Sequence, residues 1–220
     1  MKLRSLDEFS ESLNGLVAWR RHELKNLQSF FNSQRTPLPA LVKSALLLAY
    51  AHWEGGVKDM ASLYLRYVER QRRPRKELNV SFLALASLSA IRSSATSNQL
   101  LPYRQVVDFI IHNGDERFRL PNIQLIDTES NLSTNVLKNI LMCIGQPEAW
   151  SEFEDKQRTI DVALLATRNA IAHTGRTDRE EVPLQELLQD VLDLLERFKT
   201  LLENSAATKR YLAQPLHAAA

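Results

Sequence analysis

The sequence has little cysteine, glycine or proline: its 220 residues include one cysteine, six glycines and eight prolines. The single Cys143 excludes a disulfide bond within the chain and offers no cysteine cluster for a metal ion. Few glycines and prolines disfavour a turn-rich all-β fold, whereas abundant leucine and alanine favour helices. The longest apolar run, ALLLAYA at residues 45–51, is far too short to cross a bilayer.

A secretory signal is also missing, because the opening residues MKLRSLDEFSESL turn acidic and polar where an apolar core would be needed. We therefore expect a cytoplasmic protein with no membrane partner. Charged residues make up 25% and hydrophobic residues 44% of the chain, the balance of a globular domain. The net charge is only +2, but basic residues gather in RYVERQRRPRK at 66–76. That run suits either contact with phosphates or a solvated helix end, and both readings stay open.

The length suits one domain. We predict a single helical domain over residues 1–204 and a C-terminal tail over 205–220, and an inserted helical subdomain over about 72–130 is one option. The spacing of apolar residues predicts helices over 5–31, 38–70, 80–91, 103–114, 133–145, 156–173 and 183–203. Residues 93–102 and 120–130 are expected to be irregular.

Individual residues also predict the ends of one helix and the packing of another. Ser133 suits the N-cap of its helix, and Gly145 suits the position just past the end of the same helix. The pair Gly55-Gly56 lies inside a predicted helix, where glycine lowers stability. The pair therefore indicates close helix packing or a kink.

The common phosphate, dinucleotide, zinc and serine-hydrolase motifs are absent: there is no G-x-x-x-x-G-K, G-x-G-x-x-G, H-E-x-x-H or G-x-S-x-G. None of the five histidines is spaced from another as metal ligands are. We therefore expect neither a metal site nor a cofactor.

One segment does combine chemically active residues, the RNAIAH run at 168–173. Asn169 and His173 are four residues apart, so they share one face of a helix, while Arg168 lies about 140° round from His173. Gly175 is a suitable residue to end the helix, which leaves His173 in the last turn. Taken alone, the pattern fits either an ordinary helix end or a catalytic pair.

RNAIAH resembles the R-x4–6-H signature of HEPN domains, in which a polar residue, often Asn, follows the Arg. LLLAYAHWEGGVKDMASLYLRYV (46–68) resembles the second helix of HEPN-like nucleases from bacterial defence and toxin–antitoxin loci. VAWRRHELKNL (17–27) resembles the first helix of that branch, and SNLSTNVLKNIL (130–141) resembles part of its C-terminal half. The resemblance covers roughly residues 13–200.

The resemblance implies an all-α fold, a HEPN-type helical bundle with additional helices, that forms a homodimer and cleaves RNA without a metal. It implies that Arg168, Asn169 and His173 are catalytic, and that the protein is a toxin or anti-phage defence effector with an antitoxin or defence-system partner. The sequence departs from the family pattern at Thr174, where a glycine often follows the His.

The residue types agree with this chemistry. RNA transesterification needs a base, an acid and a positive charge on the phosphate oxygens. Histidine suits both proton transfers near neutral pH, and arginine binds phosphate with a planar, permanently charged group. One chain offers one of each in the motif, and a two-fold dimer offers two.

Further candidates for contact with RNA are Arg20, Arg21, His52, Glu54 and Arg176. For His52 and Glu54 the alternative is hydrogen bonding within the fold, because both lie on a largely apolar helix. For the two adjacent arginines the alternative is pairing with acidic residues. Two other functions also stay open: a non-catalytic HEPN module that binds RNA or a protein, and a helical scaffold in which RNAIAH is only a helix end.

Overall fold

The computed structural model describes residues 3–95, 98–175 and 183–213, and the regular elements in these ranges are all helical. The α-helices are α1 (Leu6–Asn32), α2 (Pro39–Arg70), α3 (Val80–Ala95), α4 (Leu100–His112), α5 (Thr134–Cys143), α6 (Thr167–Thr174) and α7 (Leu184–Ala207). Shorter elements are the 3-10 turns η1 (Arg75–Glu77), η2 (Pro147–Glu152) and η3 (Glu154–Lys156), and the π-helical η4 (Thr159–Ala166). The predicted all-α fold class is confirmed. No helix within the described ranges has the length and apolar character needed to span a membrane.

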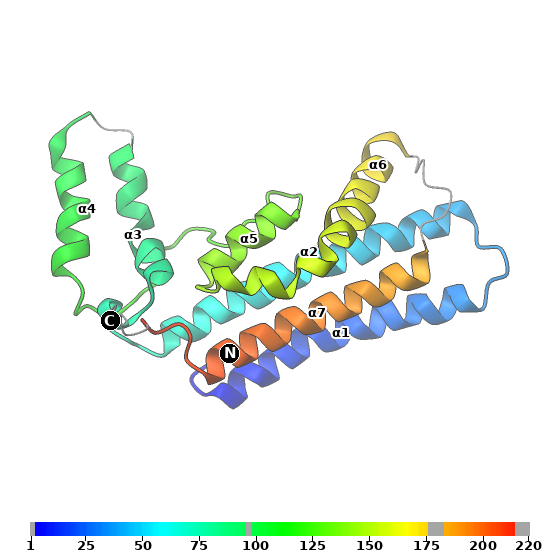
Figure 1. Cartoon of the computed structure of the whole chain (residues 1–220), viewed down its shortest axis with the longest axis horizontal. Helices are drawn as coiled ribbons and strands as arrows, with labels where there is room; N and C mark the ends of the chain where they lie inside the picture. Colours follow the sequence, from blue (N-terminus) through cyan, green and yellow to red (C-terminus); the bar gives the residue numbers. More distant parts are fainter. Residues whose placement is uncertain (1–2, 96–97, 176–182, 214–220) are drawn as a thin grey trace, which may run out of the picture.

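The core is a bundle of the three long helices α1, α2 and α7, which lie side by side along the molecule (Figure 1). Their facing side chains are buried, among them Phe9 of α1, Trp53 of α2 and Phe198 of α7. A Cβ atom at Gly56 would collide with the buried Leu195 side chain, which would have to move, so glycine allows the close approach of α2 to α7. Gly56 of the glycine pair therefore marks close helix packing.

The structure confirms the predicted ends of α5. The Ser133 hydroxyl accepts a hydrogen bond from the Val136 N–H at 3.3 Å, as an N-cap does. Gly145 has φ of +73°, the left-handed conformation that glycine adopts at little cost just past a helix.

The prediction of an irregular segment over 93–102 is wrong at both ends. Helix α3 continues to Ala95, and α4 begins at Leu100. Serine was the misleading signal, because its hydroxyl often competes with helical hydrogen bonds. Here the Ser93 hydroxyl donates to the Ser89 carbonyl at 3.0 Å and stays within the helix.

Helices α3 and α4 form a hairpin that projects from one end of the bundle (Figure 1). Arg75 holds its base: the guanidinium donates to the Asn113 carbonyl, pairs with Glu116 at 3.0 Å and lies 4.3 Å from the centre of the Phe109 ring. The hairpin falls within residues 72–130, for which an inserted subdomain stays a prediction.

The chain after α7 packs back onto the molecule. Tyr211 is buried, and its carbonyl accepts the Asn79 N–H at 2.9 Å. The Ala213 N–H donates to the Glu77 carbonyl at 2.8 Å. Residues up to 213 are therefore docked, while a domain boundary at 204 stays a prediction.

The two adjacent glycines of α2 allow a matched test of its packing. Gly56→Ala should lower the free energy of unfolding by about 1–3 kcal/mol relative to Gly55→Ala, because only the first collides with Leu195. Both substitutions share the gain in helix propensity of about 1 kcal/mol, so the difference isolates the collision. Urea unfolding measures both, and equal stabilities would contradict the proposed contact.

Candidate active site

The sequence led us to expect a regular α-helix up to the end of RNAIAH, but part of this helix is π-helical. Residues Thr159–Ala166 form the π-helical η4, and α6 continues from Thr167. A π-helix has wider turns than an α-helix and is often found beside functional sites. Side chains on neighbouring helices bind η4 from two sides. Asp161 accepts the Thr134 N–H at 2.8 Å and the Thr134 hydroxyl at 2.7 Å, which ties η4 to the start of α5.

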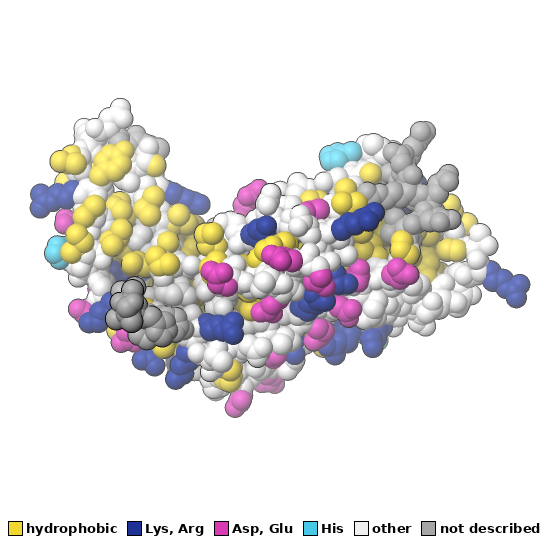
Figure 2. Space-filling model, viewed as in Figure 1, with side chains coloured by type: hydrophobic (Ala, Val, Ile, Leu, Met, Phe, Trp, Pro, Cys, Tyr) yellow, Lys and Arg dark blue, Asp and Glu magenta, His cyan; other side chains and the backbone are white. Residues whose placement is uncertain are grey.

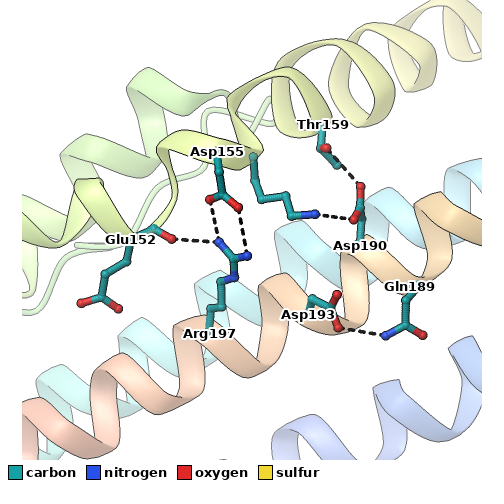
Figure 3. Close-up of polar contacts among 8 residues, drawn as sticks. Glu152, Asp155, Thr159, Gln189, Asp190, Asp193 and Arg197 are labelled. Carbon is teal, nitrogen blue, oxygen red and sulfur yellow. Dashed lines mark hydrogen bonds and ion pairs between the residues drawn. The ribbon is translucent and has the colours of Figure 1, made fainter.

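The second set of contacts joins the approach to η4 with α7 (Figure 3). Asp190 accepts hydrogen bonds from Lys156 at 2.5 Å and from the Thr159 hydroxyl at 3.1 Å. Arg197 donates two hydrogen bonds to Asp155, at 2.6 and 3.0 Å, and a third to the Glu152 carbonyl. These bonds from Arg197 hold the pKa of the Asp155 carboxyl below its ordinary value. One acidic and one basic residue of α7, Asp190 and Arg197, thus fix the segment that leads into the motif.

Helix α6 runs antiparallel to the N-terminal half of α2. At its start, the Arg168 Cζ atom lies 5.3 Å from the centre of the Tyr50 ring. At its end, Lys43 donates to the Gly175 carbonyl at 2.6 Å. Ile171 is buried and faces the core, so the opposite side of α6 is turned to solvent.

The end of α6 has the form that the sequence predicts. Gly175 has φ of +67°, and its N–H donates to the Ile171 carbonyl at 3.0 Å. Thr174, at the departure from the family pattern, stays helical, and its hydroxyl donates to the Ala170 carbonyl at 2.7 Å. His173 is exposed in this last turn.

Arg168 lies half-buried between its neighbours. Its Nη1 donates to the Asn169 side-chain oxygen at 2.8 Å, and its guanidinium lies over Tyr50, as in a cation–π contact. Arginine carries five N–H donors, and the bond to Asn169 uses one of them. The motif helix therefore presents a held cation near its start and an exposed imidazole in its last turn.

Tyr50 is a residue that sequence reasoning missed. Its hydroxyl accepts the Leu132 N–H at 2.7 Å. Burial raises the pKa of Tyr50 to about 12, and the negative charge of nearby Glu54 adds to the effect, so the phenol stays neutral near pH 7. The spacing of four residues between Tyr50 and Glu54 shows in the sequence that they share one side of α2, but it does not show that α6 meets Tyr50 there.

Glu54 lies one helical turn from Tyr50 on α2, whereas three other candidates contact other parts of the molecule. Arg20 is 3% exposed and pairs with Asp59 at 2.5 Å. Arg21 pairs with Glu196. Both arginines thus have the acidic partners that the sequence left as their alternative role.

His52 lies at the junction of α1 and α2. Its Nε2 atom is 3.0 Å from the Glu23 carboxylate, and its ring meets Trp19 edge-on with the centres 5.4 Å apart. The side chain is 5% exposed, as expected for a histidine with a role within the fold. Arg176, the remaining candidate, lies outside the described residues.

A cavity of about 520 Å³ lies at the base of the hairpin, lined by Asn79, Gln146 and Arg210 among others, and none of the motif residues lines it. In the described part of the chain, no group of three or more His, Cys, Asp or Glu side chains is arranged to hold a metal ion.

The family model described as RiboL-PSP-HEPN matches residues 16–204, most of the chain. No curated protein and no solved structure matches the chain.

His52 gives the fold a dependence on pH whose sign can be worked out. Burial lowers the pKa of this imidazole, and the nearby Arg20 adds to the effect, although Glu23 opposes it. The unfolded chain therefore takes up a proton before the folded protein does, so stability should fall as pH drops below about 6.5. His52→Gln should flatten this dependence in urea unfolding measured between pH 7.5 and 5.

The control is His22→Gln, because His22 is an exposed histidine on α1. That variant should keep the pH dependence of the unchanged protein. Equal pH dependence in the His52 variant and the unchanged protein would refute the role of burial.

Proposed function

Because the chain belongs to the RiboL-PSP-HEPN family, whose HEPN domains are typically RNases, we propose that it is a metal-independent endoribonuclease acting through α6. The observation that carries the proposal is the exposed end of this helix. There Arg168 is held by Asn169 and Tyr50, and His173 faces solvent in the last turn. An open surface of this kind suits a polymeric substrate, which an enclosed small-molecule pocket would not admit.

The proposed reaction is a transesterification within the RNA. A neutral His173 removes the proton from a 2′-OH, and the 2′ oxygen forms a bond to the adjacent phosphorus. The bond from phosphorus to the 5′ oxygen breaks, and a protonated His173 from a second chain donates a proton to that oxygen. Arg168, with Asn169 beside it, binds the phosphate oxygens as negative charge develops.

The proposed active unit is a homodimer, because one motif supplies one histidine and the reaction uses an acid and a base. Two α6 ends that face each other across a two-fold axis would supply both. The intact set of Arg168, Asn169 and His173 favours an enzyme over a non-catalytic HEPN module. The resemblance of residues 46–68 to defence and toxin–antitoxin nucleases supports a role as a toxin or anti-phage effector with a cognate partner protein.

Substitution of the motif tests the catalytic roles. Arg168→Ala and His173→Ala should each reduce cleavage of a labelled RNA by at least about 100-fold, the lower range for loss of acid–base catalysis. Neither residue is buried, so thermal unfolding should be nearly unchanged.

Matched controls exist for both substitutions. His112 is also an exposed histidine in the last turn of a helix, and Arg158 is an exposed arginine just before η4. His112→Ala and Arg158→Ala should cleave RNA at the unchanged rate. Near-normal cleavage by purified His173→Ala would overturn the assignment.

The chemistry of the products tests the nucleophile. If the 2′-OH attacks, cleavage should survive excess EDTA and leave 2′,3′-cyclic phosphate and 5′-OH ends. A substrate with one 2′-deoxy nucleotide on the 5′ side of the cut should bind nearly as well but resist cleavage there. Mass spectrometry of the products and a binding titration measure both effects, and a normal rate on the deoxy substrate would exclude this mechanism.

A further inference from the structure

Helix α4 exposes an unusual amount of apolar surface. None of its residues is buried, although the helix is 13 residues long. Its apolar residues Leu100, Tyr103, Val107, Ile110 and Ile111 are 80%, 46%, 51%, 43% and 64% exposed. We call these five residues the α4 stripe. Figure 2 shows hydrophobic side chains gathered over the projecting hairpin. A surface of this kind on a folded protein marks an interaction site.

The spacing of the α4 stripe indicates what kind of structure covers it. Leu100, Tyr103, Val107 and Ile110 are three, four and three residues apart, the spacing of a coiled-coil seam. A seam of this spacing packs best against another helix, whose side chains fit between its own. The α4 stripe is therefore shaped for a helix.

The charges beside the α4 stripe indicate which helix packs against it. Arg104 and Asp108 lie on one flank, 74% and 52% exposed, with 3.6 Å between the Arg104 Nε atom and an Asp108 carboxylate oxygen. In an antiparallel pair of α4 helices related by a two-fold axis, each Arg104 would lie opposite the Asp108 of the second copy. The charge pattern thus complements itself in the antiparallel arrangement, as an isologous interface requires.

The place of the hairpin in the molecule agrees with this pairing. The hairpin and α6 rise from the same side of the bundle, one at each end (Figure 1). A single two-fold axis running along that side would bring the α4 helices of two copies together. The same axis would bring their two α6 ends together. It would also make the two α4 helices antiparallel, since α4 stands across the long axis of the bundle.

We propose that α4 is a dimerisation arm, in which the α4 stripe packs antiparallel on α4 of a second copy of this chain. The inference rests on the proposed function, because it uses the axis that the shared ribonuclease site requires. A single helix pair covers less than the roughly 800 Å² per partner of a standard interface. The areas buried at α4 and at α6 about one two-fold axis add together. An arm that stands away from its own bundle can reach the second copy and supply this added area.

Charge reversal tests the pairing. Arg104→Asp places acids opposite acids in the homodimer, and Asp108→Arg places bases opposite bases. Each variant alone should dimerise at least about tenfold more weakly in sedimentation equilibrium, since like charges at an interface repel strongly. An equimolar mixture should form heterodimers of the original affinity, because every acid then faces a base. The mixture also shows that both variants are folded.

The control is Gln105→Asp, which adds an acid to the exposed side of α4 away from the stripe and should leave the dimer unchanged. The inference is overturned if the unchanged protein is monomeric, if each reversal dimerises normally, or if the mixture stays dissociated.

RNA cleavage by the same proteins separates the two proposals. If His173→Ala abolishes cleavage while the charge reversals on α4 leave the dimerisation affinity unchanged, only the dimerisation arm is wrong. If the charge variants behave as expected while His173→Ala cleaves normally, the arm stands and the ribonuclease site is wrong.

Discussion

The burial of α2 is the constraint on which the rest of the structure depends. Nearly half of its 32 residues are buried, which confines the helix on more than one side. On one side Gly56 brings it close to Leu195 of α7, and on another Tyr50 meets the motif helix. A helix packed on both sides cannot turn or slide without opening a cavity on one of them, because protein interiors are close-packed. The position of α2 therefore sets the position of the motif.

The motif helix itself is short, and an isolated helix of eight residues would not be stable in water. Its order comes from its surroundings: Ile171 enters the core, Lys43 holds the carbonyl of Gly175, and Asp161 and Asp190 hold the segment before it. These contacts fix the backbone and leave His173 in solvent. A reactive side chain on a fixed backbone is pre-organised for a substrate, which lowers the entropic cost of bringing the reacting groups together.

Much of the fold follows from local sequence patterns. The apolar spacing predicted α1, α2 and α7 to within a few residues, and Ser133, Gly145 and Gly175 marked helix ends correctly. The serines near the end of α3 led to a wrong helix boundary. A serine hydroxyl can form hydrogen bonds that are compatible with a helix or that compete with it, and the sequence does not show which. The π-helical turns of η4 were missed for a related reason. The choice between α and π hydrogen bonding depends on partners such as Thr134 and Asp190, which come from other helices.

The sequence by itself determined which chemical groups are available and that Arg168, Asn169 and His173 share one short helix, because spacing along a helix fixes their relative directions. Only the tertiary structure decided which other residues join them. Tyr50 and His52 are two residues apart on α2, so their side chains point to different sides of that helix. The sequence shows this separation but not which side α6 covers. Packing placed Tyr50 beside Arg168 and turned His52 toward α1, because contacts between distant segments depend on how whole helix faces fit together.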